Sequence, residues 1–208
     1  MTAMERPRRS GDHILRHFRR GRFAARHVCG MLLAAAAAAL APTAARAADL
    51  SGWDRTRWGM TSAEIARLYR DRAVTLSGHI DFNRLYTDVA LRKEPFAGYD
   101  FTVYFQMDDN THRLAQVLLE RRRQYATPAA WRDVLAALER SFGTATKSCE
   151  RHGEPLAGEP QISERVWALP TTTVYASYLD FGNGERSELS RRLLVRYAPT
   201  RRAAAACR

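Results

Sequence analysis

Hydrophobic and polar residues change their spacing several times along the chain, and each spacing predicts a different element. Near residue 61 the pattern predicts a short helix. Thr61 has the side chain of an N-cap and Glu64 follows three residues later, which is the capping-box spacing. Met60 and Ile65 occupy the two positions of a hydrophobic staple. The helical spacing then fades, so we expect this helix to end between residues 69 and 72.

Alternation of apolar and polar residues replaces the helical spacing after this helix. Such alternation has the period of a strand with one buried face. Residues Asp108–His112 have the composition of a turn and separate two of the alternating stretches. The sequence therefore predicts a hairpin or meander, with strands over residues 87–91, 101–107 and 114–122.

Helical spacing returns over residues 128–142. Thr127 is placed as the N-cap of this second helix, and Gly143 is placed to end it. Residues 144–163 are rich in Gly, Pro, Ser and Thr, so we expect a loop there. Strand signals resume afterwards over residues 166–169, 173–181 and 189–197.

This order of elements predicts the fold class. Strands come in two runs, each preceded by one helix, instead of alternating singly with helices. We therefore expect an α+β fold, with two helices packed on an antiparallel sheet. The two halves share a pattern that suggests a degenerate duplication. We expect a single domain over residues 48–198 and a flexible C-terminal tail over residues 199–208.

Residues 1–47 have the organisation of a secretory signal peptide. An arginine-rich stretch comes first, an alanine-rich apolar stretch covers residues 28–40, and Ala45-Arg46-Ala47 carries small residues at the positions that signal peptidase reads. We expect cleavage after Ala47 and a periplasmic or secreted chain with no transmembrane span after cleavage. An uncleaved anchor is the alternative interpretation, and the general secretory and twin-arginine routes both stay open.

The predicted signal peptide changes what the charge implies. The whole chain has a net charge of +11, but residues 1–47 hold nine of its 33 basic residues and two of its 22 acidic residues. The remaining 24 basic and 20 acidic residues give a net charge of only about +4. We therefore expect no nucleic-acid partner.

Two cysteines remain after residue 47, Cys149 and Cys207. In an exported chain an even number of cysteines suggests one disulfide between them. The alternative is two free thiols, because Cys207 lies in the expected flexible tail.

The mature chain offers few residues for catalysis or metal binding. Its three histidines, His79, His112 and His152, lack the spacing of a metal site. Cys149 and His152 have the spacing of a nucleophile and its base, but the loop supplies no third group to orient them. The sequence holds neither a G-x-S-x-G elbow nor a phosphate loop. We expect no catalytic residue, no metal and no cofactor.

Basic and aromatic residues suggest a binding patch instead. The runs Arg121–Arg123 and Arg191–Arg192 concentrate positive charge, while alternation places Tyr104 and Tyr175 on the outer faces of their strands. Tyr104, Tyr175, Arg121 and Arg123 are the candidate patch. The alternative interpretation is a solvated strand edge that the arginines protect from aggregation.

The segment Trp58-Gly59-Met60-Thr61-x-x-Glu64 resembles the opening of small exported proteobacterial proteins of uncharacterised function. In these proteins a W-G-M-[ST]-x-x-E segment begins the first helix. A strand–turn–strand follows, then a helix ending in an aromatic-Gly pair, here Phe142-Gly143, so the resemblance covers most of residues 53–197. More distantly the segment is similar to that of the outer-membrane assembly lipoproteins of the SmpA/OmlA (BamE) type and the β-lactamase-inhibitor-protein fold. The chain lacks the lipobox of those lipoproteins. The resemblance implies a structural role for the segment and brings no catalytic residues.

These observations favour a soluble, non-enzymatic binding or interaction module of the cell envelope, with an envelope protein as a candidate partner. The alternative is a small periplasmic enzyme, such as a hydrolase. A pocket that gathers the histidines with carboxylates would favour the enzyme. A continuous exposed aromatic and basic sheet face would favour the binding module.

Overall fold

The computed structural model describes residues 51–122, 125–153, 159–182 and 190–202. The predicted signal peptide, Arg123 and Cys207 lie outside these residues, so the predictions made for them stay predictions. None of the helices in the described ranges is long and apolar enough to cross a membrane.

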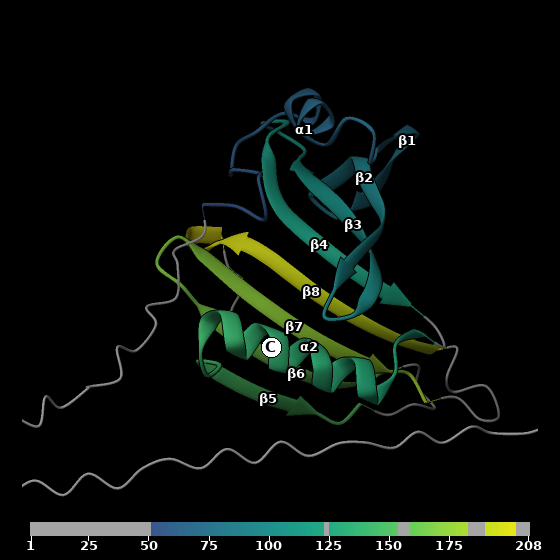
Figure 1. Ribbon diagram of the computed structural model, residues 1–208, viewed down its shortest axis with the longest axis vertical. Helices are drawn as coiled ribbons and strands as arrows, with labels where there is room; N and C mark the ends of the chain where they lie inside the picture. The colour runs from purple at the N-terminus through teal and green to yellow at the C-terminus, as the bar shows by residue number, and fades with distance from the viewer. Residues whose placement is uncertain (1–50, 123–124, 154–158, 183–189, 203–208) are drawn as a thin grey trace, which may run out of the picture. The chain divides into compact units, whose positions relative to one another are not determined.

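Eight strands form one antiparallel sheet in the order β1-β2-β3-β4-β8-β7-β6-β5. Each run of four strands pairs along the chain, and β4 and β8 join the two runs (Figure 1). Two α-helices and one short 3-10 helix complete the described elements. In chain order these are α1 (Ser62–Tyr69), β1 (Ala73–Phe82), β2 (Leu85–Phe96), β3 (Tyr99–Asp108), β4 (Leu114–Arg122), α2 (Pro128–Phe142), β5 (Lys147–Arg151), β6 (Gln161–Ala168), β7 (Thr172–Asp180), β8 (Arg191–Pro199) and η4 (Thr200–Arg202).

The expected α+β class, with two helices packed on an antiparallel sheet, is wrong. The fold is dominated by its eight-stranded sheet, and the α-helices have only 8 and 15 residues. The sequence underestimated the strand content because the two edge strands carry no clear alternation. Most side chains of β1 are exposed, and β5 lies in the polar stretch over residues 144–163 that was expected to be a loop.

The helix boundaries follow the local signals. The Thr61 hydroxyl accepts a hydrogen bond from the Glu64 amide at 3.3 Å, and the Thr61 amide donates to Glu64 Oε2 at 2.8 Å, so the predicted capping box is confirmed. Thr127 caps α2 by accepting from the Ala130 amide at 3.1 Å. Gly143 ends α2 with a φ of 78°, a conformation that favours glycine.

One face of the sheet, which we call the core face, carries the buried apolar side chains. A row of them crosses five strands in register: Phe105, Val117, Tyr197, Val174 and Trp167. Tyr69 of α1 stacks on Phe105 with ring centroids 5.4 Å apart, and Val134 and Leu138 of α2 belong to the same core cluster.

The opposite face, which we call the outer face, mixes aromatic, aliphatic and charged side chains. Its central row follows from the same registers and contains Tyr104, Leu118, Arg196, Tyr175 and Val166.

The strands continue past residue 198, where the domain was expected to end. β8 runs to Pro199, and the first residue of η4, Thr200, bonds back to the sheet. Its amide donates to the Thr171 carbonyl at 3.0 Å and its hydroxyl donates to the Leu169 carbonyl at 2.8 Å. Residues 199–202 of the predicted tail therefore belong to the end of β8 and to η4, whereas its residues 203–208 lie outside the described ranges.

Candidate binding site

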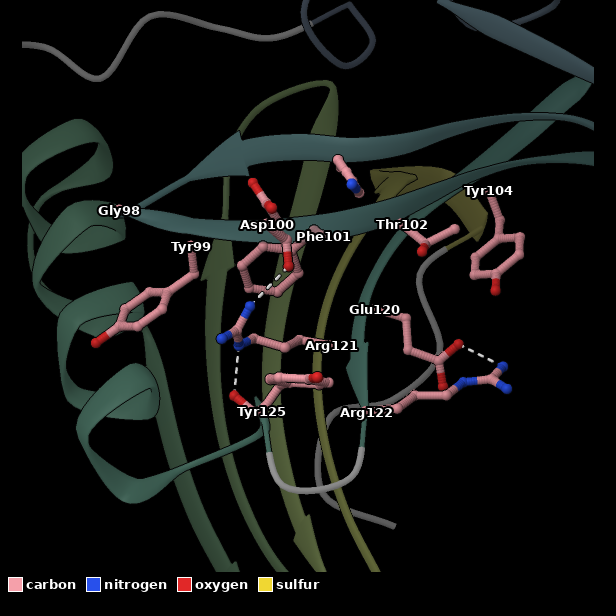
Figure 2. A pocket seen from close by; sticks show the side chains of 11 residues that line it. Gly98, Tyr99, Asp100, Phe101, Thr102, Tyr104, Glu120, Arg121, Arg122 and Tyr125 are labelled. Atoms are coloured by element: carbon pink, nitrogen blue, oxygen red, sulfur yellow. Dashed lines mark hydrogen bonds and ion pairs between the residues drawn. The ribbon is translucent and has the colours of Figure 1, made fainter. Parts of the chain in front are cut away.

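A pocket of about 730 Å³ opens where β3 begins and β4 ends (Figure 2). Its walls come from three neighbouring strands, the β2–β3 turn and the segment after β4. The lining residues are Lys93, Gly98, Tyr99, Asp100, Phe101, Thr102, Tyr104, Glu120, Arg121, Arg122 and Tyr125.

A tight turn positions the β3 side of the pocket. Phe96 and Tyr99 pair directly, so only Ala97 and Gly98 connect β2 to β3. Both connecting residues have positive φ, 52° and 82°, as a type I′ hairpin turn requires. Gly98 adopts this conformation without strain, and the turn carries Tyr99 and the residues after it into the pocket wall.

An ion pair between a buried carboxylate and a half-exposed guanidinium forms the outer-face side of the pocket. Glu120 on β4 is only 5% exposed, and its Oε2 lies 2.6 Å from Nη2 of Arg122, two residues along the same strand. A carboxylate at this depth needs a charged partner, because removing it from water is costly. The hydrogen bond from Arg122 to Glu120 raises the pKa of Arg122, so the guanidinium stays charged. The pair therefore fixes a charged group at the pocket wall.

Tyr104 lies next to this ion pair on the outer face. Its ring is half-buried and approaches that of Phe82 on β1, with centroids 5.9 Å apart. Burial raises the pKa of Tyr104, and the nearby Glu120 carboxylate raises it further. The phenol therefore stays protonated at neutral pH and offers a hydrogen-bond donor beside the buried charges.

Arg121 lies in the pocket wall opposite the Glu120–Arg122 pair (Figure 2). Its guanidinium carbon lies 4.8 Å from the centroid of Tyr99 and 5.5 Å from that of Tyr125. Nη1 donates to the Asp100 carbonyl at 2.9 Å, and Nε donates to the Tyr125 carbonyl (Figure 2). The Tyr99 hydroxyl in turn donates to Asp133 on α2 at 2.6 Å. Arg121 thus connects β3, β4 and the segment leading to α2, and its role in the pocket is to position the wall.

Lys93 stands on β2, and β3 lies between this strand and β4. The β2–β3 register shifts between Leu91 and Glu94, and Lys93 within this irregularity has a φ of 55°. Irregularities of this kind redirect a side chain relative to the regular pleat. Lys93 is exposed and lines the pocket.

The structure brings together only part of the predicted patch. Tyr104 and Arg121 line the same pocket, whereas Arg123 lies outside the described residues. Tyr175 occupies the outer face as alternation predicted, but it is only 2% exposed. The guanidinium of Arg196 covers its ring at 4.2 Å, so Tyr175 is part of the packing and not an exposed contact.

Sequence reasoning missed the pairing of Glu120 with Arg122, which it named only within the run Arg121–Arg123, and it missed Tyr99 and Lys93. The sequence held a signal for Glu120 and Arg122, because residues two apart on a strand share a face and these two side chains have opposite charges. No local pattern marked Lys93, since its placement depends on an irregularity in strand pairing.

The segment Trp58–Glu64 packs as a structural element. The Gly59 amide donates to the Leu114 carbonyl at 3.0 Å, and the Leu114 amide donates to the Met60 carbonyl at 2.8 Å. Gly59 has a φ of 87°, which explains the glycine. Trp58 and Gly59 also line a smaller cavity of about 230 Å³ beside Pro199.

The pocket lining contains none of the three histidines, and the rings of His79 and His112 both contact that of Tyr86, with centroids 5.5 and 5.8 Å away. His79 on β1 pairs with Asp81 at 3.2 Å, His112 in the β3–β4 turn is 3.0 Å from the Tyr86 hydroxyl, and His152 follows β5. Within the ranges that the structure describes, no group of three or more His, Cys, Asp or Glu side chains is placed to hold a metal ion.

The chain matches no family model, and no curated protein or solved structure shows significant similarity to it.

Proposed function

We propose that this chain is a non-enzymatic binding protein of the cell envelope and that the pocket between β3 and β4 holds its ligand. The observation that carries the proposal is the pocket itself, about 730 Å³ with walls fixed by the Glu120–Arg122 pair and by stacked Arg121. This volume lies within the range of small-molecule sites. A wall held in place before binding lowers the entropic cost of binding.

The envelope location rests on the leader. An arginine-rich stretch, an alanine-rich stretch and Ala45-Arg46-Ala47 support export, and a binding module of the envelope is the class that fits an exported chain with this pocket.

The geometry supports binding more than hydrolysis. A hydrolase of the Cys–His kind needs a nucleophile and a base within hydrogen-bond reach of each other. The pocket lining includes tyrosine, arginine, lysine and two carboxylates but none of His79, His112 and His152. Its buried carboxylate, Glu120, is already bound to Arg122. The lining side chains therefore have the character of a recognition surface.

Photocrosslinking at the pocket tests the proposal. Benzoylphenylalanine replaces Tyr125, which is 58% exposed at the pocket edge, and in a matched chain it replaces Arg140, which is exposed on α2. Irradiation of intact cells should give an adduct with an envelope component from position 125 but not from position 140. The adduct should weaken when Lys93→Ala, a change at an exposed residue of the pocket lining, is added. Equal adducts from both positions, or none from position 125, would contradict a binding role for the pocket.

A further inference from the structure

Positive charge collects at the ends of β4 and β8. Arg122 and Arg192 are direct partners in the β4–β8 register and both belong to the outer face. Like charges directly opposite each other on a sheet destabilise it. Arg122 is compensated by Glu120. The guanidinium carbon of Arg192 lies 5.9 Å from the centroid of the Phe181 ring, an interaction that adds no negative charge. Across the part of the chain that the structure describes, no carboxylate forms an ion pair with Arg192 or Lys93.

The other charged groups nearby are partly neutralised. Arg121 gives its Nη1 and Nε donors to backbone carbonyls and is stacked between two rings. Arg191, next to Arg192 but on the core side, pairs with Asp180 at 2.9 Å. The lining also contains two carboxylates, Asp100 and the Glu120 that pairs with Arg122. Of the cations in the lining, Lys93 and Arg122 are left to meet a ligand, and Arg192 lies beside Arg122 outside the lining.

Hydroxyl groups extend this set of donors. Thr102 is the direct partner of Glu120 on β3, and Tyr104 follows on the same face. Both line the same pocket as Lys93 and Arg122. An anion placed here meets ammonium, guanidinium and hydroxyl donors together, and charge-assisted hydrogen bonds of this kind are the stronger ones.

We infer that the pocket takes an anionic ligand, with its carboxylate or phosphate group bound between Lys93 and Arg122 and its polar body against Tyr104 and Thr102. This inference rests on the proposed function, because it names the class of ligand for the same pocket. Arg192, the direct partner of Arg122 in the β4–β8 register, adds positive charge beside the site.

A titration of the isotope-labelled mature chain, followed by amide NMR shifts, tests the ligand class. Four probes of similar size separate the chemistry: glucuronate carries a carboxylate, glucose 6-phosphate carries a phosphate, glucose is neutral and glucosamine is cationic. One or both anions should give saturable shifts at residues 93, 102, 104, 120 and 122, and the preferred anion identifies the group. Binding should weaken as salt rises. Stronger shifts with glucosamine, or no saturable shift with either anion up to about 20 mM, would overturn the inference.

Charge variants provide the matched controls. Lys93→Gln should weaken anion binding about three- to tenfold, and Arg140→Gln on α2 should leave it unchanged. These sites are exposed, so the variants keep the fold, whereas Arg122→Gln would strand the buried Glu120 carboxylate. Equal binding by Lys93→Gln and Arg140→Gln would refute the inferred site. If the crosslink at position 125 forms but no anion binds, the ligand class is wrong and the binding function stands.

Discussion

The indole Nε1 of Trp58 donates a hydrogen bond to the Thr172 hydroxyl at 3.0 Å, across 114 residues of sequence. Trp58 precedes α1, and the fully buried Thr172 begins β7. The bond therefore connects the segment before α1 to the start of β7. It is a second link between the two halves of the chain, in addition to the β4–β8 pairing. The backbone bonds of Gly59 and Met60 to Leu114 hold the same segment on β4.

A double-mutant cycle measures the contribution of this connection. Trp58→Phe keeps an aromatic ring but removes the donor, and Thr172→Val removes the hydroxyl at nearly constant volume. Trp58→Phe should lower the free energy of unfolding by about 1 kcal/mol through the lost bond. In denaturant unfolding, the two changes should cost about 1 kcal/mol less together than their separate costs added. Strictly additive costs would show that the bond does not stabilise the fold.

Thr61 should contribute to stability through the α1 capping box. Thr61→Ala removes the acceptor for the Glu64 amide, and loss of such a cap typically costs about 1 kcal/mol. Thr61→Ser keeps the acceptor and is the matched control, so its unfolding midpoint should stay near that of the parent chain. If Thr61→Ala left stability unchanged but abolished ligand binding, the structural role of the Trp58–Glu64 segment would be wrong.

The cost of Thr61→Ala should also depend on pH. Hydrogen bonds from the Thr61 backbone first, and from its side chain second, lower the pKa of Glu64 from its usual 4.5. A lowered carboxyl pKa contributes stability that is present above the unfolded-state value and is lost as the pH falls through the folded-state value. The difference in unfolding midpoint between Thr61→Ala and the parent chain should therefore shrink below pH 4.5. A difference that grows in acid would contradict this.

The helices and most strands were predictable because their signals are local. Thr61 and Glu64 are three residues apart, and Thr127 and Gly143 bracket α2 in the sequence itself. The dominance of the sheet was not predictable in this way. β1 lies at a sheet edge with mostly exposed side chains, so burial imposes no alternation on it. The same reasoning applies to β5 at the other edge.

The candidate site was only partly predictable for a related reason. Alternation placed Tyr104 and Tyr175 on the outer face, but it does not say which outer-face residues are covered. Arg196 covers Tyr175 because β8 pairs with β7, a contact between segments whose pairing no local motif encodes. Glu120 is charged and lies on the outer face, yet it is buried there and paired with Arg122.

Lysine should not be able to replace Arg121 in stabilising the pocket wall. The planar guanidinium stacks between Tyr99 and Tyr125 while donating to two carbonyls, and an ammonium group cannot reproduce this arrangement. Arg121→Lys should lower stability by about 1 kcal/mol and should reduce the crosslink at the pocket. Arg140→Lys on α2 is the control and should change neither. Full crosslinking by Arg121→Lys would show that the sandwich does not position the pocket wall.

The exported chain should begin at Ala48. Ala45-Arg46-Ala47 presents small residues at the two positions that signal peptidase reads, and the alanine-rich stretch precedes them. N-terminal sequencing of chain recovered from the periplasmic or secreted fraction checks this. Ala45→Arg together with Ala47→Arg should block cleavage and leave the larger precursor in the membrane fraction. Recovery of a mature chain that still contains residues 31–40 would refute the predicted cleavage.

Cys149 and Cys207 should form a disulfide once the chain is exported. Cys149 lies on edge strand β5 opposite Glu164 of β6. Leu169, the residue after β6, is five residues from Glu164, or about 17 Å in extended chain. Thr200 is bonded to the Leu169 carbonyl, and the seven residues from Thr200 to Cys207 reach at most about 25 Å. The chain is therefore long enough for the two cysteines to meet.

Alkylation without reductant, followed by mass spectrometry, tests this pairing in the mature chain. The expected result is no labelled cysteine before reduction and two afterwards, with a lower melting temperature for the reduced chain. Cys207→Ser should expose one reactive thiol at Cys149 and should lower the melting temperature to that of the reduced chain. Two labelled cysteines in the unreduced mature chain would refute the disulfide. Rapid selective labelling of Cys149 at neutral pH would instead indicate a thiol with a lowered pKa and would favour the enzyme alternative.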